Sequence, residues 1–242
     1  VPYTTNDGTA TTADNDYADN DGIFTFTGTA GETKTFTVQV NGDTKVELDE
    51  TFTAALGALT GAPAGVTVAG SPQTATITND ESATVSIAAN VSQSESTTPQ
   101  VFSVTLSNPV DVAVTVVFST TDGTATTGDN DYAGIAGQTV TFAAGTTTAQ
   151  TVNVAITNDS KVEADEVYNT SIGTLAAGGR SVSLGTSTRT GTITNDDNAT
   201  VTLTPAGGIT QNEGNSGTTP FMFTATLNNA VQGGFTLAYT TN

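Results

Sequence analysis

The chain has 242 residues, enough for one large or two ordinary domains, and it contains no cysteine, histidine or tryptophan. Its 24 aspartate and glutamate residues outnumber five lysine and arginine residues, so the formal net charge is −19 at pH 7. This charge argues against nucleic acid and anionic membrane surfaces as partners, because both attract basic patches. The missing histidine and cysteine remove catalytic triads, thiol chemistry, disulfides and the usual zinc or haem sites, so we expect that the chain is not an enzyme.

The chain alternates short apolar runs with turn residues. No apolar run approaches the roughly 20 residues that span a bilayer, so we expect no membrane insertion in this segment. Low hydrophobicity and high charge leave a disordered or mucin-like stalk as an alternative. Runs rich in Val, Thr, Ile and Phe, without helical periodicity, favour an all-β fold of antiparallel strands.

Internal repetition divides the chain. DGTATTADNDYA at 7–18 returns as DGTATTGDNDYA at 122–133, and KVELDETF at 45–52 returns as KVEADEVY at 161–168. A third copy begins with FTATLNNAV, which answers to FSVTLSNPV one repeat earlier. The spacing of about 116 residues is the size of one β-sandwich domain.

The repeat frame predicts three segments. Residues 1–81 hold only the later strands of a domain, residues 82–197 hold a complete domain, and residues 198–242 hold only the first strands. We expect a window of a longer tandem array, in which 198–242 of one copy and 1–81 of the next together form one domain of a continuous fibre. The predicted strands of the complete repeat lie at 83–88, 101–107, 112–119, 139–143, 149–156, 166–173 and 188–195.

An odd number of strands places the two termini of a domain at opposite poles, so tandem domains join end to end. The loops after the first, third and fifth strands, and the tail of the seventh, then meet at the C-terminal pole. Most acidic residues of the complete repeat lie there: Glu95, Asp129, Asp131, Asp159, Glu163, Asp165, Glu166, Asp196 and Asp197. Converging carboxylates repel one another unless a cation neutralises them, and an all-oxygen ligand set suits Ca²⁺. A solvated acidic pole without metal and a glycosidase-like pair of carboxylates are the alternatives.

Three phrases together resemble the Calx-β domain: TTDGTATTGDNDYA at 120–133, AITNDSKVEADEVY at 155–168 and TGTITNDD at 190–197. The resemblance covers nearly all of the complete repeat and most of the N-terminal segment. It implies an immunoglobulin-like, seven-stranded antiparallel β-sandwich that binds Ca²⁺ at its C-terminal pole.

Matched to the family, the metal ligands of the complete repeat are Glu95, Asp131, Asp159, Glu163, Glu166, Asp196 and Asp197. Their counterparts in the partial copies are Asp16, Asp43, Glu47, Glu50, Asp80, Glu81 and Glu213. This chain has Asn158 and Asn195, and in the first copy Gly42 and Asn79, where the family carries acidic residues. The lower ligand charge implies fewer ions or weaker binding, in the range of about 10⁻⁴ to 10⁻³ M known for extracellular modules.

Two further features recur beside the predicted ligands. Tyr17 and Tyr132 follow ligand aspartates, and we interpret them as core anchors. Gly8 and Gly123 in the repeated DGTA are interpreted as turn residues that need a positive φ.

Tandem arrays of this kind resemble those of giant bacterial adhesins. The resemblance implies a calcium-stiffened repeat segment of a long secreted or cell-surface bacterial adhesin or filament, serving biofilm formation, attachment or gliding motility. The expected partners are neighbouring repeats and an unknown surface ligand, and the expected location is extracellular. One alternative is a Ca²⁺-binding regulatory module of a larger transporter or receptor. Another is an accessory region of a secreted enzyme.

Overall fold

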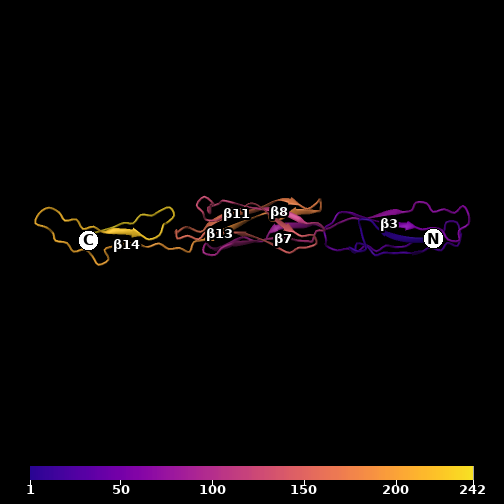
Figure 1. Cartoon of the computed structure of the whole chain (residues 1–242), viewed down its shortest axis with the longest axis horizontal. Helices are drawn as coiled ribbons and strands as arrows, with labels where there is room; N and C mark the ends of the chain where they lie inside the picture. Colours follow the sequence, from indigo (N-terminus) through magenta and orange to yellow (C-terminus); the bar gives the residue numbers. More distant parts are fainter. Residues whose placement is uncertain (242) are drawn as a thin grey trace.

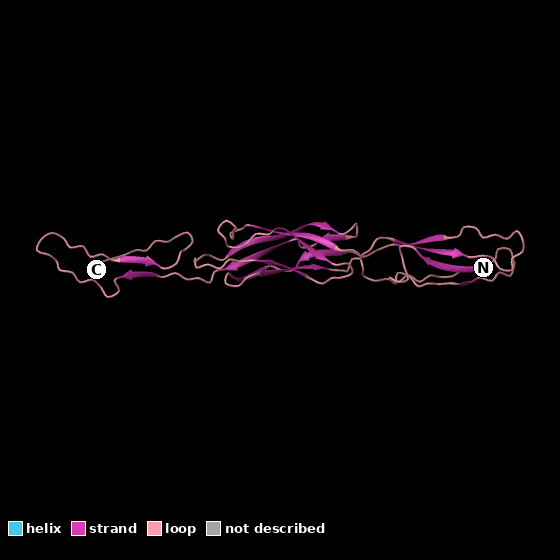
Figure 2. Cartoon of the chain, in the orientation of Figure 1, coloured by secondary structure: helices cyan, strands magenta, loops and turns pink. Residues whose placement is uncertain are grey.

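Alternating apolar and polar residues form fifteen strands and no helix in the computed structural model, which describes residues 1–241 (Figure 2). The N-terminal unit contains β1 (Pro2–Asp7), β2 (Gly22–Ile23), β3 (Glu50–Leu56) and β4 (Gln73–Ile77). The central unit contains β5 (Ala83–Ile87), β6 (Val91–Ser94), β7 (Gln100–Leu106), β8 (Val114–Thr121), β9 (Ala136–Phe142), β10 (Gln150–Val154), β11 (Glu166–Ala176), β12 (Val182–Leu184) and β13 (Thr188–Thr194). The C-terminal unit contains β14 (Val201–Thr204) and β15 (Thr224–Leu227). A search of this described part for a membrane-spanning helix finds none.

The central unit is a sandwich of two sheets. One sheet has the order β10-β7-β5-β12 and the other has the order β6-β13-β11-β8-β9. Fully buried side chains alternate with half-buried or exposed ones along β7 and over most of β8, as expected when one face of each strand points into the core. Aromatic rings of the two sheets meet in this core, where the ring centroids of Phe102 and Phe118 lie 6.0 Å apart.

Apolar side chains of the predicted strands form the core of the central unit. Twelve of them are buried: Val104, Leu106, Val114, Val116, Phe118, Val140, Phe142, Val152, Val154, Ile156, Ile172 and Ile193. The interpretation of Tyr17 and Tyr132 as core anchors is confirmed, since both are buried. Tyr168 stacks on Tyr132 with ring centroids 4.3 Å apart, and its hydroxyl donates to the buried Gln100 Oε1 at 2.6 Å.

The seven predicted strands correspond to β5, β7, β8, β9, β10, β11 and β13, and two short strands were not expected. Strand β6 pairs with β13, and β12 pairs with β5, in both cases in parallel. The sandwich is therefore not purely antiparallel. Since only three residues separate β5 from β6, the first predicted strand in effect crosses from one sheet to the other.

The two end units are open on one side. In the N-terminal unit a single antiparallel sheet of order β2-β1-β3-β4 covers a small core of Ala10, Tyr17 and Phe52. The C-terminal unit is a two-stranded antiparallel ribbon, and its Phe221, Met222 and Phe223 are exposed. Within one chain the two open units lie at opposite ends and do not pack on each other (Figure 1). Their pairing between copies stays a prediction.

The three units follow one another in a line, with the chain termini at the two ends (Figure 1). Each joint contains a short parallel β-bridge. Val46 of the N-terminal unit pairs with Val110, and Val162 of the central unit pairs with Val231 of the C-terminal unit. The partners on the far side of each joint belong to the loop that follows the second predicted strand of a repeat.

Candidate metal centre

The repeated loop at 122–133 presents Asp131 in a fixed orientation. Its carboxylate Oδ2 accepts a hydrogen bond from the Thr126 backbone N–H at 2.6 Å, and the Thr157 backbone N–H donates to the Asp131 carbonyl at 3.0 Å. The next residue, Tyr132, anchors the loop, because its hydroxyl donates to Asp122 Oδ1 at 2.8 Å while its ring lies in the core. The same hydrogen bond joins Tyr17 to Asp7 in the N-terminal unit at 2.7 Å.

The role expected for the glycines of this loop is wrong in one respect. The positive φ of 69° belongs to Asn15 and Asn130, an amino acid that tolerates this region, and not to Gly8 or Gly123. Gly123 is needed for a different reason. A Cβ atom there would lie 2.3 Å from the backbone oxygen of Val167, and one on Gly8 would lie 2.3 Å from that of Thr51.

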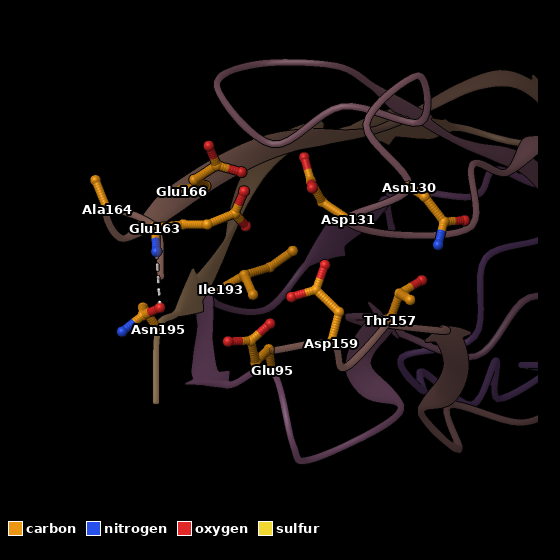
Figure 3. A pocket seen from close by; sticks show the side chains of 10 residues that line it. All are labelled: Glu95, Asn130, Asp131, Thr157, Asp159, Glu163, Ala164, Glu166, Ile193 and Asn195. Atoms are coloured by element: carbon orange, nitrogen blue, oxygen red, sulfur yellow. Dashed lines mark hydrogen bonds between the residues drawn. The ribbon is translucent and has the colours of Figure 1, made fainter. Parts of the chain in front are cut away.

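Asn195 holds the second acidic segment in place. Its side-chain Oδ1 accepts from the Glu163 backbone N–H at 2.9 Å, and its Nδ2 donates to the Asp197 carbonyl at 3.0 Å (Figure 3). Asn79 makes the equivalent bonds to Glu47 and Glu81. A carboxylate cannot donate the second of these bonds, so asparagine at 79 and 195 has a structural role beyond lowering the charge.

Three of the carboxylates converge around a lysine. Oxygen atoms of Asp129, Asp131 and Glu163 all lie within 4.8 Å of one another. The Lys161 ammonium lies 2.7 Å from Asp129 Oδ2 and also contacts Glu163, and these two hydrogen bonds raise the pKa of Lys161. This cluster therefore has an internal cation, which a metal ion would have to displace or share.

A second cluster has hydroxyl donors in place of a lysine. Oxygen atoms of Glu95, Asp196 and Asp197 lie within 4.8 Å of one another, and Glu95 is only 5% exposed. The hydroxyls of Ser94 and Ser96 donate to Asp196 and lower the pKa of its carboxyl. Asp197 Oδ2 is buried without a hydrogen-bond partner among residues 1–241. Burial, followed by the charge of Asp197, raises the pKa of Glu95, as expected for carboxylates that lack a counter-ion.

One small pocket connects the two clusters. Five predicted ligands line it, Glu95, Asp131, Asp159, Glu163 and Glu166, and their carboxylates point toward one another from separate loops and strand ends (Figure 3). Glu166, at the start of β11, is 6% exposed. Burial raises the pKa of Glu166, although a hydrogen bond from Gln232 of the C-terminal unit acts in the opposite direction.

The pole of the N-terminal unit repeats this arrangement in part. Oxygen atoms of Asp14, Asp16 and Glu47 lie within 4.8 Å of one another, and Lys45 contacts Asp14 at 2.6 Å. The predicted ligands that line a pocket there are Asp16, Asp43, Glu47, Glu50, Asp80 and Glu81. Glu213 lies in the open C-terminal unit, where it is exposed and joins no such cluster of described residues.

Sequence reasoning placed the acidic loops correctly but left some residues out. Asp14 and Asp129 are not among the predicted ligands, although each belongs to a cluster. The lysine of the repeated K-V-E was the signal that could have found these two aspartates. Lys45 binds Asp14, and Lys161 binds Asp129, in each case two positions before the predicted ligand of the loop. Gln232 was missed because it comes from the next unit.

The donor set fits a hard divalent cation. Both clusters consist of carboxylate oxygens, and the hydroxyls of Ser94 and Ser96 lie beside the second one. Ca²⁺ takes six to eight oxygen ligands in flexible geometry. The buried, unpartnered Asp197 Oδ2 is the clearest mark of a missing positive charge. Glu95, Asp196 and Asp197 would hold one ion, and Asp131, Glu163 and Glu166 would contribute to another across the pocket.

The comparisons with known proteins agree with this fold. The family model described as the Calx-beta domain matches residues 1–82 and 78–198, so the chain belongs to the Calx-beta family. Calx-beta domains are calcium-binding modules. No curated protein sequence matches the chain significantly.

Several solved structures match parts of this chain. The apo form of the Calx CBD1 domain shares 22% identity over 48% of this chain and 100% of its own, with a TM-score of 0.44. The CBD12 tandem of CALX1.2 shares 20% identity over 79% of this chain and 86% of its own, with a TM-score of 0.42. The calcium-binding domain CBD12 of CALX1.1 shares 21% identity over 79% of this chain and 85% of its own, with a TM-score of 0.40.

Calcium uptake is expected to release protons near neutral pH. Burial, followed by the charges of Asp16 and Glu47, raises the pKa of Glu50 to about 7, whereas the carboxyl of an unfolded glutamate titrates near 4.3. The folded state thus holds this proton more tightly, and its stability falls as the pH rises through this interval. An arriving cation favours the ionised carboxylate and expels the proton. Calorimetric titrations at pH 6.5, in two buffers of different ionisation enthalpy, should give different heats, and Glu50→Gln should reduce the difference. Equal heats in both buffers for the unaltered chain would contradict this expectation.

Proposed function

We propose that the chain is a calcium-stiffened repeat segment of a long secreted or cell-surface bacterial protein, an adhesin or filament, located outside the cell. Residues 82–197 are one full repeat of the array in this proposal. Neighbouring repeats contact one another, and a surface ligand is bound by another part of the protein. Attachment, biofilm formation and gliding are the activities that such a stalk serves, and none of them requires catalysis by this segment.

One observation carries the proposal: the acidic pole of a unit is also its joint with the next unit. Glu166 Oε1 of the central pole accepts a hydrogen bond from Gln232 Nε2 of the C-terminal unit at 2.8 Å. Directly before Glu163 in the chain, the Val162 backbone N–H donates to the Ala230 carbonyl at 2.9 Å. Neutralising the carboxylates of the pole therefore affects the angle between two units as well as the conformation of the acidic loops.

The charge of the pole explains why a cation is needed for stiffness. Nine carboxylates belong to the pole of the central unit, whereas the positive charge described there comes from Lys161. Two unit charges about 4 Å apart repel by about 4 kcal/mol at an effective dielectric constant of 20. Without added cations, this repulsion favours opening of the joint, where water and salt reach the carboxylates.

Removing calcium should shorten the molecule without unfolding the central unit. The hydrophobic core of this sandwich does not include the predicted ligands, so it is expected to survive chelation. Small-angle scattering of the chain in Ca²⁺ and in EDTA should show a smaller maximum dimension in EDTA, while far-ultraviolet circular dichroism stays constant. An unchanged scattering profile, with calorimetry showing that Ca²⁺ binds, would overturn the stiffening role.

A further inference from the structure

Val46 belongs to the N-terminal unit by sequence but to the core of the central unit by contact. Its side chain is 0% exposed and forms part of the same buried cluster as Val110 and the side chains of the central sandwich. The Val46 backbone N–H donates to the Pro109 carbonyl at 2.8 Å, and the Asp111 N–H donates to the Val46 carbonyl at 3.1 Å. A single residue of one unit thus fills a place in the core of the next.

The second joint is built in the same way. Val162, the repeat counterpart of Val46, pairs with Val231 through two hydrogen bonds of 2.9 Å, to the Ala230 carbonyl and from the Gln232 N–H. The two joints have the same pairing and the same bond pattern in two units of different completeness. The valine contact is therefore a property of the repeat and does not depend on one pair of units.

The residue that follows the loop valine, Val110 or Val231, differs between the two joints. At the second joint this residue is Gln232, which contacts Glu166. At the first joint it is Asp111, which binds Arg180 through two hydrogen bonds, one of them 2.7 Å from Arg180 Nε. The hydrogen bond to Asp111 raises the pKa of Arg180, with smaller contributions from the charges of Glu47 and Glu50 across the joint. At the second joint the following unit therefore places a hydrogen-bond donor beside a carboxylate of the preceding unit.

The docking valine lies between Glu47, a member of a carboxylate cluster, and Lys45, which binds that cluster. Lys45 and Glu47 precede and follow Val46, and both contact or belong to the cluster of Asp14, Asp16 and Glu47. Glu47 and Val46 are adjacent in the same backbone segment. A cation that fixes Glu47 therefore also restrains Val46 in the core of the central unit.

We propose that the valine of the repeated K-V-E is the docking residue through which each repeat inserts into the core of the next, and that docking and cation binding strengthen each other. The partner is the following repeat of the same polypeptide, recognised by a β-branched apolar side chain and a two-bond parallel bridge. The linkage to the cation rests on the proposed function, whereas the docking itself does not.

Spin labels on both sides of the first joint test the docking. Since the chain has no cysteine, Thr74→Cys and Thr151→Cys, both at exposed strand positions, introduce a unique pair of labels on the full chain. Double electron-electron resonance should give a narrow distance distribution in Ca²⁺. Val46→Ala and the nearly isosteric Val46→Thr should both broaden it. The matched control is Leu48→Ala in the same segment, because Leu48 is 49% exposed and its repeat counterpart is already Ala164. A narrow distribution in both Val46 variants would overturn the docking.

Titration of the same variants with Ca²⁺ tests the linkage. Val46→Ala should weaken calcium binding of the N-terminal unit about five-fold or more, at the lower end of typical coupling between two sites, while Leu48→Ala leaves it unchanged. Equal affinities in Val46→Ala and the unaltered chain would overturn the linkage. If the unaltered chain takes up no Ca²⁺, the proposed function fails, and the distance measurements still decide whether Val46 docks.

Discussion

Calcium at a hundred times its dissociation constant should raise the free energy of unfolding of the central unit by about 2.7 kcal/mol for each ion bound. The physical reason is that the ligands come from four separate places in the chain, Glu95, Asp131, Glu163 and Asp197 among them, and meet only in the folded state. An unfolded chain offers no comparable set of oxygens. Thermal or urea unfolding with Ca²⁺ and with EDTA, followed by circular dichroism, measures the difference.

Glu95→Gln should remove most of this gain and leave the calcium-free protein at least as stable. Glu95 is buried beside Asp196 and Asp197, so loss of its charge relieves repulsion in the absence of a cation. Glu213→Gln is the matched control, because Glu213 is the repeat counterpart of Glu95 in a unit that has no complete pole. A stabilisation by Ca²⁺ that is equally large in Glu95→Gln and Glu213→Gln would show that the ion binds elsewhere.

The strands of the central unit were predictable because burial of one face imposes local alternation. Val114, Val116 and Phe118 at every second position mark β8 without knowledge of any other strand. Strands β6 and β12 were not predictable in this way. They are short, and their pairing with β13 and β5 depends on where the chain crosses between sheets, which is a property of the whole sandwich.

The site was predictable at the level of loops. Repetition and the alternating direction of strands were sufficient to bring the acidic loops to one pole, and the pocket of Figure 3 combines them. The separation into two clusters was not predictable, because it depends on whether Lys161 or the hydroxyls of Ser94 and Ser96 reach a given carboxylate. Side-chain reach of this kind is set by tertiary packing.

Inter-repeat contacts were the least visible in the sequence. Val46 lies among charged residues and follows no strand periodicity, so its pattern is typical of an exposed loop. Its burial arises because the following unit supplies the other wall of the socket. The signal that could have found this contact is the recurrence of valine at the same place in two repeats, Val46 and Val162.

The largest loss of stability is expected from Phe102→Ala. Phe102 on β7 is fully buried, with its ring centroid 6.0 Å from that of Phe118 and 6.2 Å from that of Tyr168. Removing a buried phenylalanine side chain costs about 3–5 kcal/mol, since the transfer free energy is lost and a cavity remains. Urea unfolding of the central unit should show this as a large decrease in the midpoint.

The repeat supplies its own control in Phe223, which occupies the same place in FTATLNNAV as Phe102 does in FSVTLSNPV. Phe223 is 55% exposed, and among residues 1–241 no strand follows β15 to cover it. Phe223→Ala should therefore change the free energy of unfolding by less than about 0.5 kcal/mol. Appending a second copy of residues 122–197 after Asn242 should complete that sandwich, and the cost of Phe223→Ala should then approach that of Phe102→Ala. If Phe223→Ala stays neutral in the extended chain, although the added residues fold, the equivalence of the two positions is wrong.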